Sequence, residues 1–163
     1  MNMTKSDKTN ELLSTHSLDG LGDELDVPFL KLLGVKCLRA GMGEGEVGLE
    51  LKPEHTNTWD VAHGGVLLTL VDVSMAIAAR AADPYDRSVV TIELKNNFLQ
   101  AASGSIRVHA KAIHHTATLA FCEAKLYDAN NRVCAMATGT FKYLKKLPAR
   151  DAQGARVVKD DQR

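Results

Sequence analysis

Residues 62–82 of this 163-residue chain read AHGGVLLTLVDVSMAIAARAA, and this stretch decides the fold. The run is apolar on nearly every side, so it predicts a long helix, from about Gly64 to Ala82, that is buried rather than lying on a surface. Asp72 is the one charge deep inside the run. Because a carboxylate among apolar side chains is costly unless it has a partner or does chemistry, Asp72 indicates where to look for function.

The segments on either side of this helix alternate apolar and polar residues, which predicts strands. Before the helix we expect a short helix after Pro28 and a hairpin over residues 35–39 and 45–52. After it we expect four strands, over residues 88–98, 105–115, 119–128 and 132–144. One long apolar helix needs a curved sheet around it and another surface over its remaining side. The sequence therefore predicts an α+β fold, in which a curved antiparallel β-sheet wraps around one long central helix.

The two ends of the chain are polar and aperiodic, unlike its middle. We expect residues 1–20 to be disordered and residues 145–163 to form a charged tail. The folded domain is then expected over residues 21–144, which is the usual size of a single domain.

Composition argues against several classes of partner. Lys and Arg together number 20, as do Asp and Glu, whereas surfaces for nucleic acid or anionic membranes normally carry a basic excess. Residues 1–20 lack the apolar centre of a signal peptide, and no run reaches the ~18–20 apolar residues that span a bilayer. The three cysteines, Cys37, Cys122 and Cys134, have no CxxC spacing. We therefore expect reduced, buried thiols in a cytoplasmic protein.

The helix start has the features of an oxyanion site. Gly64 and Gly65 allow a tight turn and a close approach of a ligand to the backbone. The first N–H groups of a helix lack internal partners and lie at the positive end of its dipole. These glycines could equally form an ordinary turn, His63 could be a helix cap, and Asn57 could be a turn residue.

The spacing between His63 and Asp72 predicts a dimer. Nine residues of helix correspond to ~13.5 Å along the axis and a rotation of ~900°, which is half a turn net. Asp72 and the helix start of one chain therefore face opposite ways and cannot share one small site. If two helices run antiparallel across a two-fold axis, Asp72 of one chain can approach the start of the other. The hypothesis is an obligate homodimer with two composite sites.

Other site chemistries find no support in the sequence. It contains no GxSxG, HExxH, P-loop or dinucleotide-binding motif. His114 and His115 are neighbours in an expected strand, so they point to opposite faces and cannot bind one metal ion together. We therefore expect no metal ion and no cofactor.

These motifs resemble the hotdog-fold thioesterases, in particular the phenylacetic-acid-degradation (PaaI-like) branch. The pattern of that branch is an asparagine, then His-Gly-Gly, then Leu-x-Asp within the helix. Here it reads NTWDVAHGGVLLTLVD over residues 57–72, with further likeness in VTIELKNNFL (residues 90–99) and AMATGTF (residues 135–141). The resemblance covers about 110 residues and implies a hotdog fold, in which the curved sheet wraps around the central helix, with the short helix near the N-terminus.

The resemblance also implies roles for individual residues in the hydrolysis of acyl-CoA thioesters. Gly64 would donate its N–H to the thioester carbonyl, and Asp72 of the partner chain would act as general base or nucleophile. Asn57 and His63 would orient the thioester or the water, and Thr91 would position the water beside Asp72. The expected substrate-binding residues are Gly65, Val66, Leu68 and Val90. Coenzyme A would enter only as part of the substrate.

One segment departs from the family pattern. Where the family often has Gly-Arg or Gly-Lys, near the coenzyme A nucleotide, this chain has His114-His115-Thr116-Ala117. The choice between coenzyme A and an acyl carrier protein therefore stays open. Arg80, Arg87 and Arg107 could supply charge for phosphates, but solvated surface positions are the expectation for all three.

Several alternatives stay open at this point. The same fold could act as a hydratase or dehydratase on acyl thioesters, or could bind acyl-CoA without catalysis. The acyl group could be aromatic, such as phenylacetyl, or a medium-length aliphatic chain. The resemblance implies a homotetramer built as a dimer of dimers, because exposed sheet faces commonly pair, but it does not indicate which faces pair.

Overall fold

The long helix forms where the sequence predicts it. In the computed structural model, which describes residues 27–144, helix α4 spans Gly64–Ala81. His63 is its N-cap and Ala82 its C-cap. Pro84 disfavours a helical conformation for Asp83, which agrees with the end of the helix at this point. The expected disordered segment, residues 1–20, and the expected tail, residues 145–163, lie outside the described residues.

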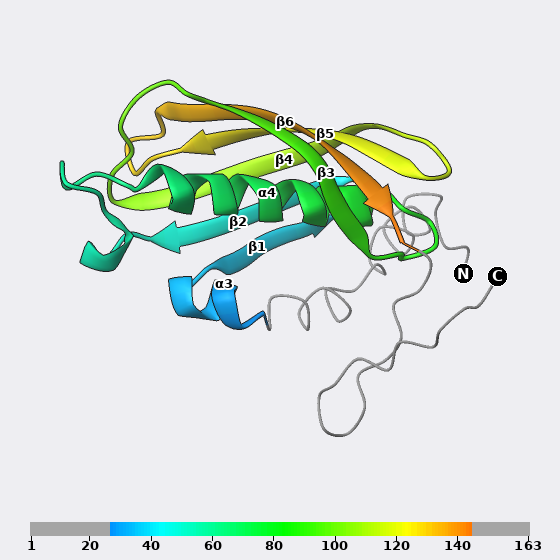
Figure 1. Ribbon diagram of the computed structural model, residues 1–163, viewed down its shortest axis with the longest axis horizontal. Helices are drawn as coiled ribbons and strands as arrows, with labels where there is room; N and C mark the ends of the chain where they lie inside the picture. Colours follow the sequence, from blue (N-terminus) through cyan, green and yellow to red (C-terminus); the bar gives the residue numbers. More distant parts are fainter. Residues whose placement is uncertain (1–26, 145–163) are drawn as a thin grey trace, which may run out of the picture.

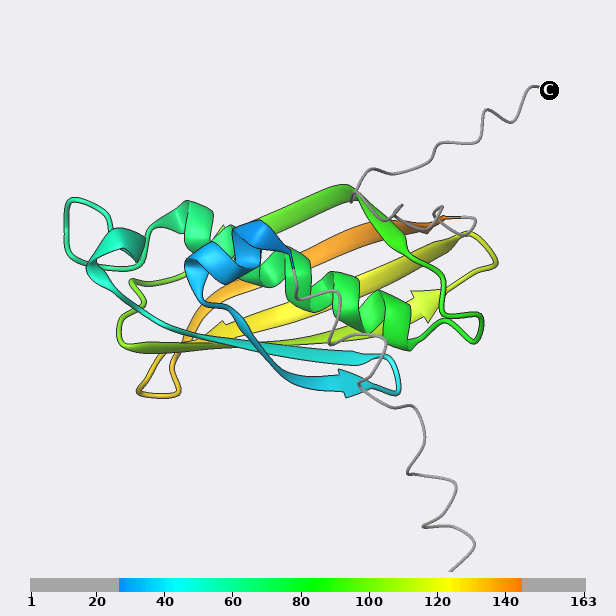
Figure 2. The ribbon, with the colours of Figure 1, turned by 90° about the horizontal axis from the view of Figure 1, so that it is seen from below.

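The predicted strands and the short helix are also confirmed, with ends shifted by a few residues. The elements around α4 are α3 (Pro28–Leu33), β1 (Lys36–Gly41), β2 (Glu44–Glu50), a 3₁₀ turn η2 (Pro53–His55), β3 (Val89–Phe98), β4 (Ser105–His115), β5 (Leu119–Tyr127) and β6 (Val133–Tyr143). The strands form one antiparallel sheet in the order β1-β2-β4-β5-β6-β3. The sheet curves around α4, which lies along its concave face (Figures 1 and 2). This is the hotdog fold.

Helix α4 can lie close to the sheet because small residues stand at the contact. A Cβ atom on Gly45 of β2 would come within 2.4 Å of the Ser74 carbonyl oxygen, so only glycine fits there. The Ser74 hydroxyl donates to the carbonyl of Gly45 at 2.9 Å. The core around this contact is made of aliphatic residues of α4 and the inward residues of β2, β4, β5 and β6. Its burial is the main stabilising contribution.

The helix is not covered on all sides, which corrects the expectation of an entirely buried helix. Leu70, Val71 and Met75 are fully buried against the sheet. A stripe on the other side of α4 is only partly buried or exposed, and it contains Leu68, Thr69, Asp72, Val73 and Ala76. By length and composition α4 could also cross a membrane, but half of it is buried inside this domain, as in the core helix of a soluble protein. The open stripe is the side that the sequence predicts to need another surface.

Strand β3 forms one edge of the sheet and contains a bulge. Its register with β6 shifts between Thr91 and Glu93, and such a bulge moves the alternation of side chains by one residue. Directly opposite residues share a face of the sheet. The partners of Thr91, Asn96 and Phe98 are the buried residues Phe141, Ala137 and Ala135. These three β3 side chains therefore share the concave face with α4.

Two buried carboxylates hold connecting segments in place. Asp83, after α4, accepts hydrogen bonds from the backbone N–H of Arg87 and from its guanidinium, at 2.8–3.0 Å. Asp128, between β5 and β6, is bonded in the same way by Arg132. The guanidinium hydrogen bonds lower the pKa of Asp83 and of Asp128. Both carboxylates are therefore fully occupied by structural partners.

All three cysteines are free thiols, as the sequence predicts. Cys122 and Cys134 are buried, and Cys37 is partly buried. Burial raises the pKa of Cys122 to about 12, so this thiol stays protonated and acts as a small apolar core residue.

Candidate functional site

The start of α4 leaves one backbone donor free. The His63 ring caps the helix, because its Nδ1 accepts the N–H of Gly65 at 3.0 Å. The carbonyl of His63 accepts from the N–H groups of Val66 and Leu67. Within residues 27–144 the N–H of Gly64 donates to no side chain or loop carbonyl. This N–H, at the positive end of the helix, is therefore available to bind an oxyanion.

Phe98 lies over this helix start. A Cβ atom placed on Gly64 would be 3.4 Å from Cζ of Phe98, the residue that ends β3. The Phe98 side chain is itself 56% exposed. An aromatic ring therefore forms one wall beside the free N–H, and a Cβ atom at position 64 would be in van der Waals contact with it.

Asp72 lies two turns further along α4 and is not neutralised. Its Oδ1 accepts a hydrogen bond from the Thr91 hydroxyl at 2.8 Å. Among the described residues, no lysine, arginine or histidine forms an ion pair with it. The residue is half-buried on the open stripe of the helix rather than fully buried. A carboxylate with one hydroxyl donor and no cation keeps its basic oxygen free for chemistry.

Within one chain the two halves of the predicted site are apart. Gly64 and Asp72 are eight residues apart on the same helix, which corresponds to ~12 Å along its axis. Phe98 stands at the end of β3 beside Gly64, whereas Thr91 is bonded to Asp72 near the start of that strand. The structure brings His63, Gly64 and Gly65 together, and separately Asp72 and Thr91.

Asn57 shapes the loop before the helix. Its side-chain oxygen accepts the N–H of Trp59 at 2.9 Å, and its backbone N–H donates to the Val61 carbonyl. The next connection to the helix start is a hydrogen bond from the N–H of His63 to the carbonyl of His55. In the chain by itself Asn57 is thus a turn residue, the open alternative, and no hydrogen bond joins its side chain to His63 or Asp72.

The expected substrate-binding residues fall into two groups. The N–H of Gly65 is used by His63, and Val66 is half-buried beside the core. Leu68 and Val90 are 40% and 43% exposed, one turn before Asp72 and next to Thr91. Leu68 therefore offers apolar surface near Asp72, whereas Val90 stands opposite the exposed Lys142 and turns to the other face of the sheet. The backbone of Gly65 has little left to donate.

The three candidate arginines are already paired. Arg80 is only 8% exposed, which corrects the expectation of a solvated position, and it contacts Asp86 at 2.9 Å. Arg87 pairs with Asp83, and Arg107 pairs with Glu46 at 3.2 Å. None of these guanidinium groups is reserved for a phosphate. No group of three or more His, Cys, Asp or Glu residues in the described region could hold a metal ion.

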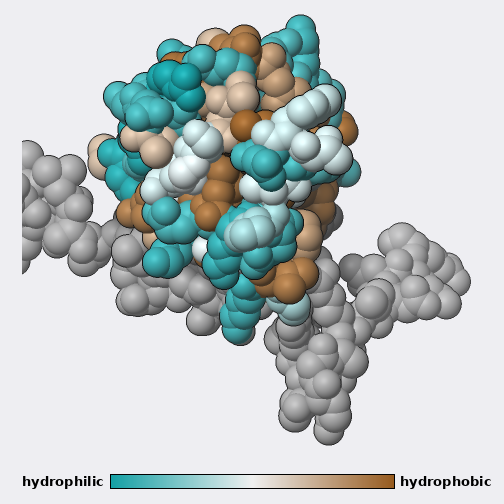
Figure 3. Space-filling model, turned by 90° about the vertical axis from the view of Figure 1, so that its left-hand side faces the viewer, coloured by the Kyte–Doolittle hydropathy of each residue, from teal (hydrophilic) through white to brown (hydrophobic). Residues whose placement is uncertain are grey.

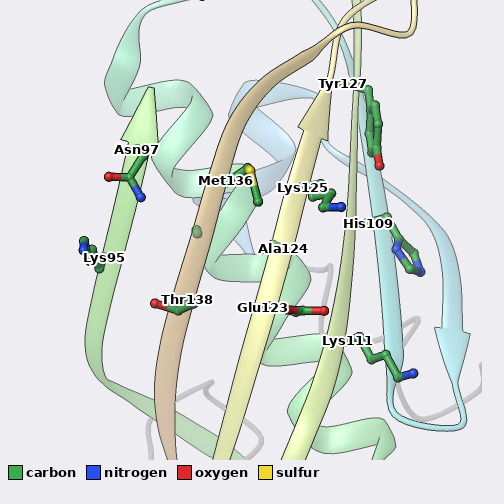
Figure 4. A pocket seen from close by; sticks show the side chains of 11 residues that line it. Lys95, Asn97, His109, Lys111, Glu123, Ala124, Lys125, Tyr127, Met136 and Thr138 are labelled. Carbon is green, nitrogen blue, oxygen red and sulfur yellow. The ribbon is translucent and has the colours of Figure 1, made fainter. Parts of the chain in front are cut away.

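A shallow hollow of about 340 Å³ lies on the other face of the sheet, away from α4 (Figure 4). Its polar lining comes mainly from Lys95, Lys111, Lys125, His109 and Glu123. It contains none of the predicted site residues and lies across the sheet from Asp72. We therefore place the candidate active site at α4 and β3.

Two residues of β3 that share the concave face with Thr91, Asn96 and Phe98, were not predicted to take part in the site. Both fall in the stretch that carries the resemblance, but an uninterrupted alternation through residues 88–98 gives no sign that they share a face with Thr91. The bulge between Thr91 and Glu93 produces that arrangement. Because a bulge has no fixed sequence signature, only the structure could reveal it.

Comparisons with known proteins show which family this chain resembles. A family model described as the thioesterase superfamily matches residues 60–135, which include the helix start, Asp72 and all of β3. A protein of Saccharolobus solfataricus that carries the name of a candidate esterase is 31% identical over 117 residues, or 71% of this chain and 82% of that protein.

Solved structures of other proteins share the fold of this chain. A conserved protein of Pseudomonas aeruginosa is 32% identical, with a TM-score of 0.68, over 72% of this chain and 94% of that one. The PaaI protein of the phenylacetic acid degradation operon of E. coli has a TM-score of 0.71 over 78% of this chain and 91% of that one. At 16% identity, the latter likeness shows the fold alone.

Figure 3, which looks onto the end where α4 begins, shows apolar residues exposed among hydrophilic ones there.

Proposed function

Because this chain belongs to the thioesterase superfamily, we propose that it hydrolyses acyl-CoA thioesters to a free acid and coenzyme A. Membership follows from the family match and from relatives that are more than 30% identical over most of their length. Membership alone assigns neither acyl-CoA as the substrate nor the PaaI-like branch, and both are part of our proposal. The observation that carries it is that one helix holds both a free N-terminal N–H and a carboxylate with no cationic partner among the described residues.

Gly64 has the properties that an oxyanion donor needs. Attack on a thioester carbonyl develops negative charge on its oxygen, and a fixed backbone N–H at a helix start stabilises that charge without reorganisation. His63 holds the first turn in place by accepting the N–H of Gly65. We propose that the thioester oxygen binds to the N–H of Gly64 and that the ring of Phe98 lies beside the bound thioester.

Asp72 is the proposed source of the attacking oxygen. As a general base it would take a proton from water while that water attacks the carbonyl carbon. The C–S bond then breaks, and the proton goes to the departing thiolate. As a nucleophile it would instead form a mixed anhydride that water hydrolyses. Incorporation of labelled solvent oxygen into the enzyme in a single turnover distinguishes the two routes.

The neighbours of Asp72 and Gly64 are proposed as positioning residues. The Thr91 hydroxyl holds one carboxylate oxygen at 2.8 Å, which leaves the other to face the water. Asn57 fixes the loop that leads into the helix through its hydrogen bond to Trp59. Its proposed contact with the thioester or water would then form only when substrate and partner chain are present.

We further propose that each site is composite and that the protein is a homodimer. Gly64 and Asp72 of one chain are too far apart to act on the same carbonyl, whereas two antiparallel helices related by a two-fold axis would bring them together. Such a partner would find apolar surface on the open stripe of α4 and at the edge of the sheet. The exposed residues at this edge are Ile92 and Phe98 of β3 and Leu99, which follows the strand. We also propose that two such dimers pair through their sheet faces to form a tetramer. The proposed location of the protein is the cytoplasm.

Mixed dimers test the composite site directly. Asp72→Asn and Gly64→Pro each remove one half, and Pro is tolerated at the first helical position. Co-expression of the two variants, each with a different affinity tag, gives a mixed dimer with one intact site. We expect about a quarter of wild-type activity in a random mixture and none in either parent dimer. If the mixture stays as inactive as its parents, each site lies within one chain.

The first experiment is a panel of aromatic and aliphatic acyl-CoAs, with thiol release followed by a disulfide-exchange dye. Hydrolysis predicts release by the wild type and its loss in Asp72→Asn. Formation of an enoyl thioester without thiol would indicate a dehydratase instead. Binding without any turnover would indicate a non-catalytic acyl-CoA-binding module.

A further inference from the structure

The side chain of Asn96 is a feature of the described residues that neither the fold nor the proposed reaction explains. Its amide oxygen and nitrogen are both shielded from solvent, and neither has a hydrogen-bond partner in the described part of the protein. Buried polar groups are normally satisfied, and each exception calls for an explanation. Since both ends of one amide are unsatisfied, the missing partners must supply a donor and an acceptor, which one group can combine.

The neighbours of Asn96 on its face of the sheet are apolar. It stands opposite Ala137 of β6, which is 5% exposed, on the concave face of the sheet. Leu94 stands opposite Gly139 and Phe98 opposite Ala135 on that same face. An apolar side chain at position 96 would continue this surface without an unsatisfied group, so folding alone does not require an asparagine here.

The position of Asn96 relative to Gly64 identifies what could reach it. Phe98, whose ring lies over Gly64, is two residues further along β3, which is ~6.6 Å in a strand. The Asn96 side chain turns toward the concave face rather than outward from the sheet edge. A partner strand at that edge would therefore not meet it, whereas a group that enters beside Phe98 and Gly64 would. The partner's α4 helix, which we propose lies on this side, is the other group that could reach it, and loss of dimer in Asn96→Leu would reveal that contact.

We propose that Asn96 is a specificity-determining residue that selects acyl groups carrying an oxygen several carbons from the thioester. This inference rests on the proposed function, because it places the thioester carbonyl at the N–H of Gly64. A hydroxyl is the simplest group that both donates and accepts, and it would satisfy the oxygen and the nitrogen of the amide. Displacement of the exposed Phe98 ring by the acyl group would open the way to Asn96.

Substrate pairs that differ by one atom test this proposal. Heptanoyl-CoA and 6-hydroxyhexanoyl-CoA have chains of equal length, with a methyl group in one and a hydroxyl in the other. Analogues with the hydroxyl on carbon 4 or 5 place it at shorter distances from the thioester carbonyl. We expect the wild type to prefer the best-placed hydroxyl over its apolar counterpart by about 10- to 100-fold in kcat/KM, because an apolar chain leaves the amide unsatisfied.

Asn96→Leu is the diagnostic variant, and Asn97→Leu is its matched control. Asn97 is the next residue and lies on the opposite, exposed face of the strand. Asn96→Leu should reverse the preference and raise the melting temperature, because it removes an unsatisfied amide, whereas Asn97→Leu should leave the preference unchanged. A structural role for Asn96 predicts the opposite: a lower melting temperature or loss of dimer, with the preference unaltered.

Binding measurements separate this proposal from the proposed function. If no acyl-CoA is hydrolysed, the proposed function fails, and calorimetric affinities of the same pairs for wild type and Asn96→Leu still report the selection. Equal affinities and equal kcat/KM for every hydroxyl position would overturn the role of Asn96. A preference that survives in Asn96→Leu would overturn it as well.

Discussion

Three aspartates of this protein show two ways of placing a carboxylate in a fold. The side chains of Asp83 and Asp128 are fully buried, and each is bonded to the backbone and guanidinium of an arginine four residues later. Among residues 27–144, Asp72 has one hydroxyl donor and no cationic partner, and it lies on the open stripe of α4. Two carboxylates thus have a full set of hydrogen-bond partners, and the third has only one.

This difference separates residues that stabilise the fold from residues that are free for chemistry. A carboxylate with several strong donors stabilises the segment around it but has no oxygen left to act as a base. A carboxylate held by one hydroxyl is oriented yet still available. We therefore expect substitutions at Asp83 to change stability and substitutions at Asp72 to change activity.

The largest expected effect is that of Asp72→Asn. The amide keeps the size of the side chain and can still accept from Thr91, but it can neither take a proton nor attack. We expect thiol release from the best acyl-CoA to fall by ~10²–10⁴-fold, with an unchanged melting temperature. Asp83→Asn is the control, and it should retain its activity per folded molecule. Equal activity loss in both variants would remove the distinction between the two kinds of carboxylate.

Gly64→Pro tests the other half of the site. It removes the one N–H in question, and the φ and ψ of His63, −64° and 133°, are those that a residue before proline favours. We expect kcat to fall by ~10²–10³-fold, the usual cost of one oxyanion donor. Gly64→Ala adds the same Cβ atom near Phe98 but keeps the N–H. If alanine is as damaging as proline, crowding by Phe98 explains the loss, and the N–H does not.

Thr91→Val removes the hydroxyl that holds Asp72 and keeps the shape of the side chain. We expect about a tenfold decrease in kcat, because the carboxylate stays in place but loses its orientation. Thr91→Ser retains the hydroxyl and should restore most of the activity. A full loss in Thr91→Val would mean that the hydroxyl itself contacts the reacting water, and an unchanged kcat would mean that Asp72 is oriented by the partner chain.

Much of this arrangement could be predicted from the sequence. The apolar run around Asp72 gave the helix nearly to its ends, since periodicity is a strong signal over a long segment. The alternation in residues 105–115 and 119–128 gave β4 and β5 and their buried faces in the same way. Asp72 was recognisable because a lone charge in such a run is rare.

Other parts could not be predicted, for physical reasons. The place of Asn96 and Phe98 depends on a bulge in β3, which shifts the alternation at a point that no residue type announces. The buried position of Arg80 depends on tertiary packing at the end of α4. Thr91 was indicated only by the family resemblance, because its contact with Asp72 joins two segments that are 19 residues apart.

The smallest expected effects concern stability, and they test the structural side of the comparison. Asp83→Asn should lower the melting temperature by about 5 °C at neutral pH, because it leaves the Arg87 guanidinium with a neutral partner. Scanning calorimetry of Asp83→Asn beside Asp72→Asn checks this, since Asp72 has no such partner to lose. A larger decrease in Asp72→Asn would show that the half-buried carboxylate, too, mainly serves the fold.

Acidification should reveal the same ion pairs. The guanidinium hydrogen bonds lower the pKa of Asp83 and of Asp128 below the usual value of 3.8. A folded-state pKa below the unfolded one contributes stability that is present above the unfolded pKa and is lost as the pH falls through the folded pKa. The melting temperature of the wild type should therefore decrease as the pH falls below about 4. Asp83→Asn should show a shallower decrease over that range, because one of the two groups no longer titrates; an equally steep decrease would mean that the carboxylate of Asp83 gains nothing from Arg87.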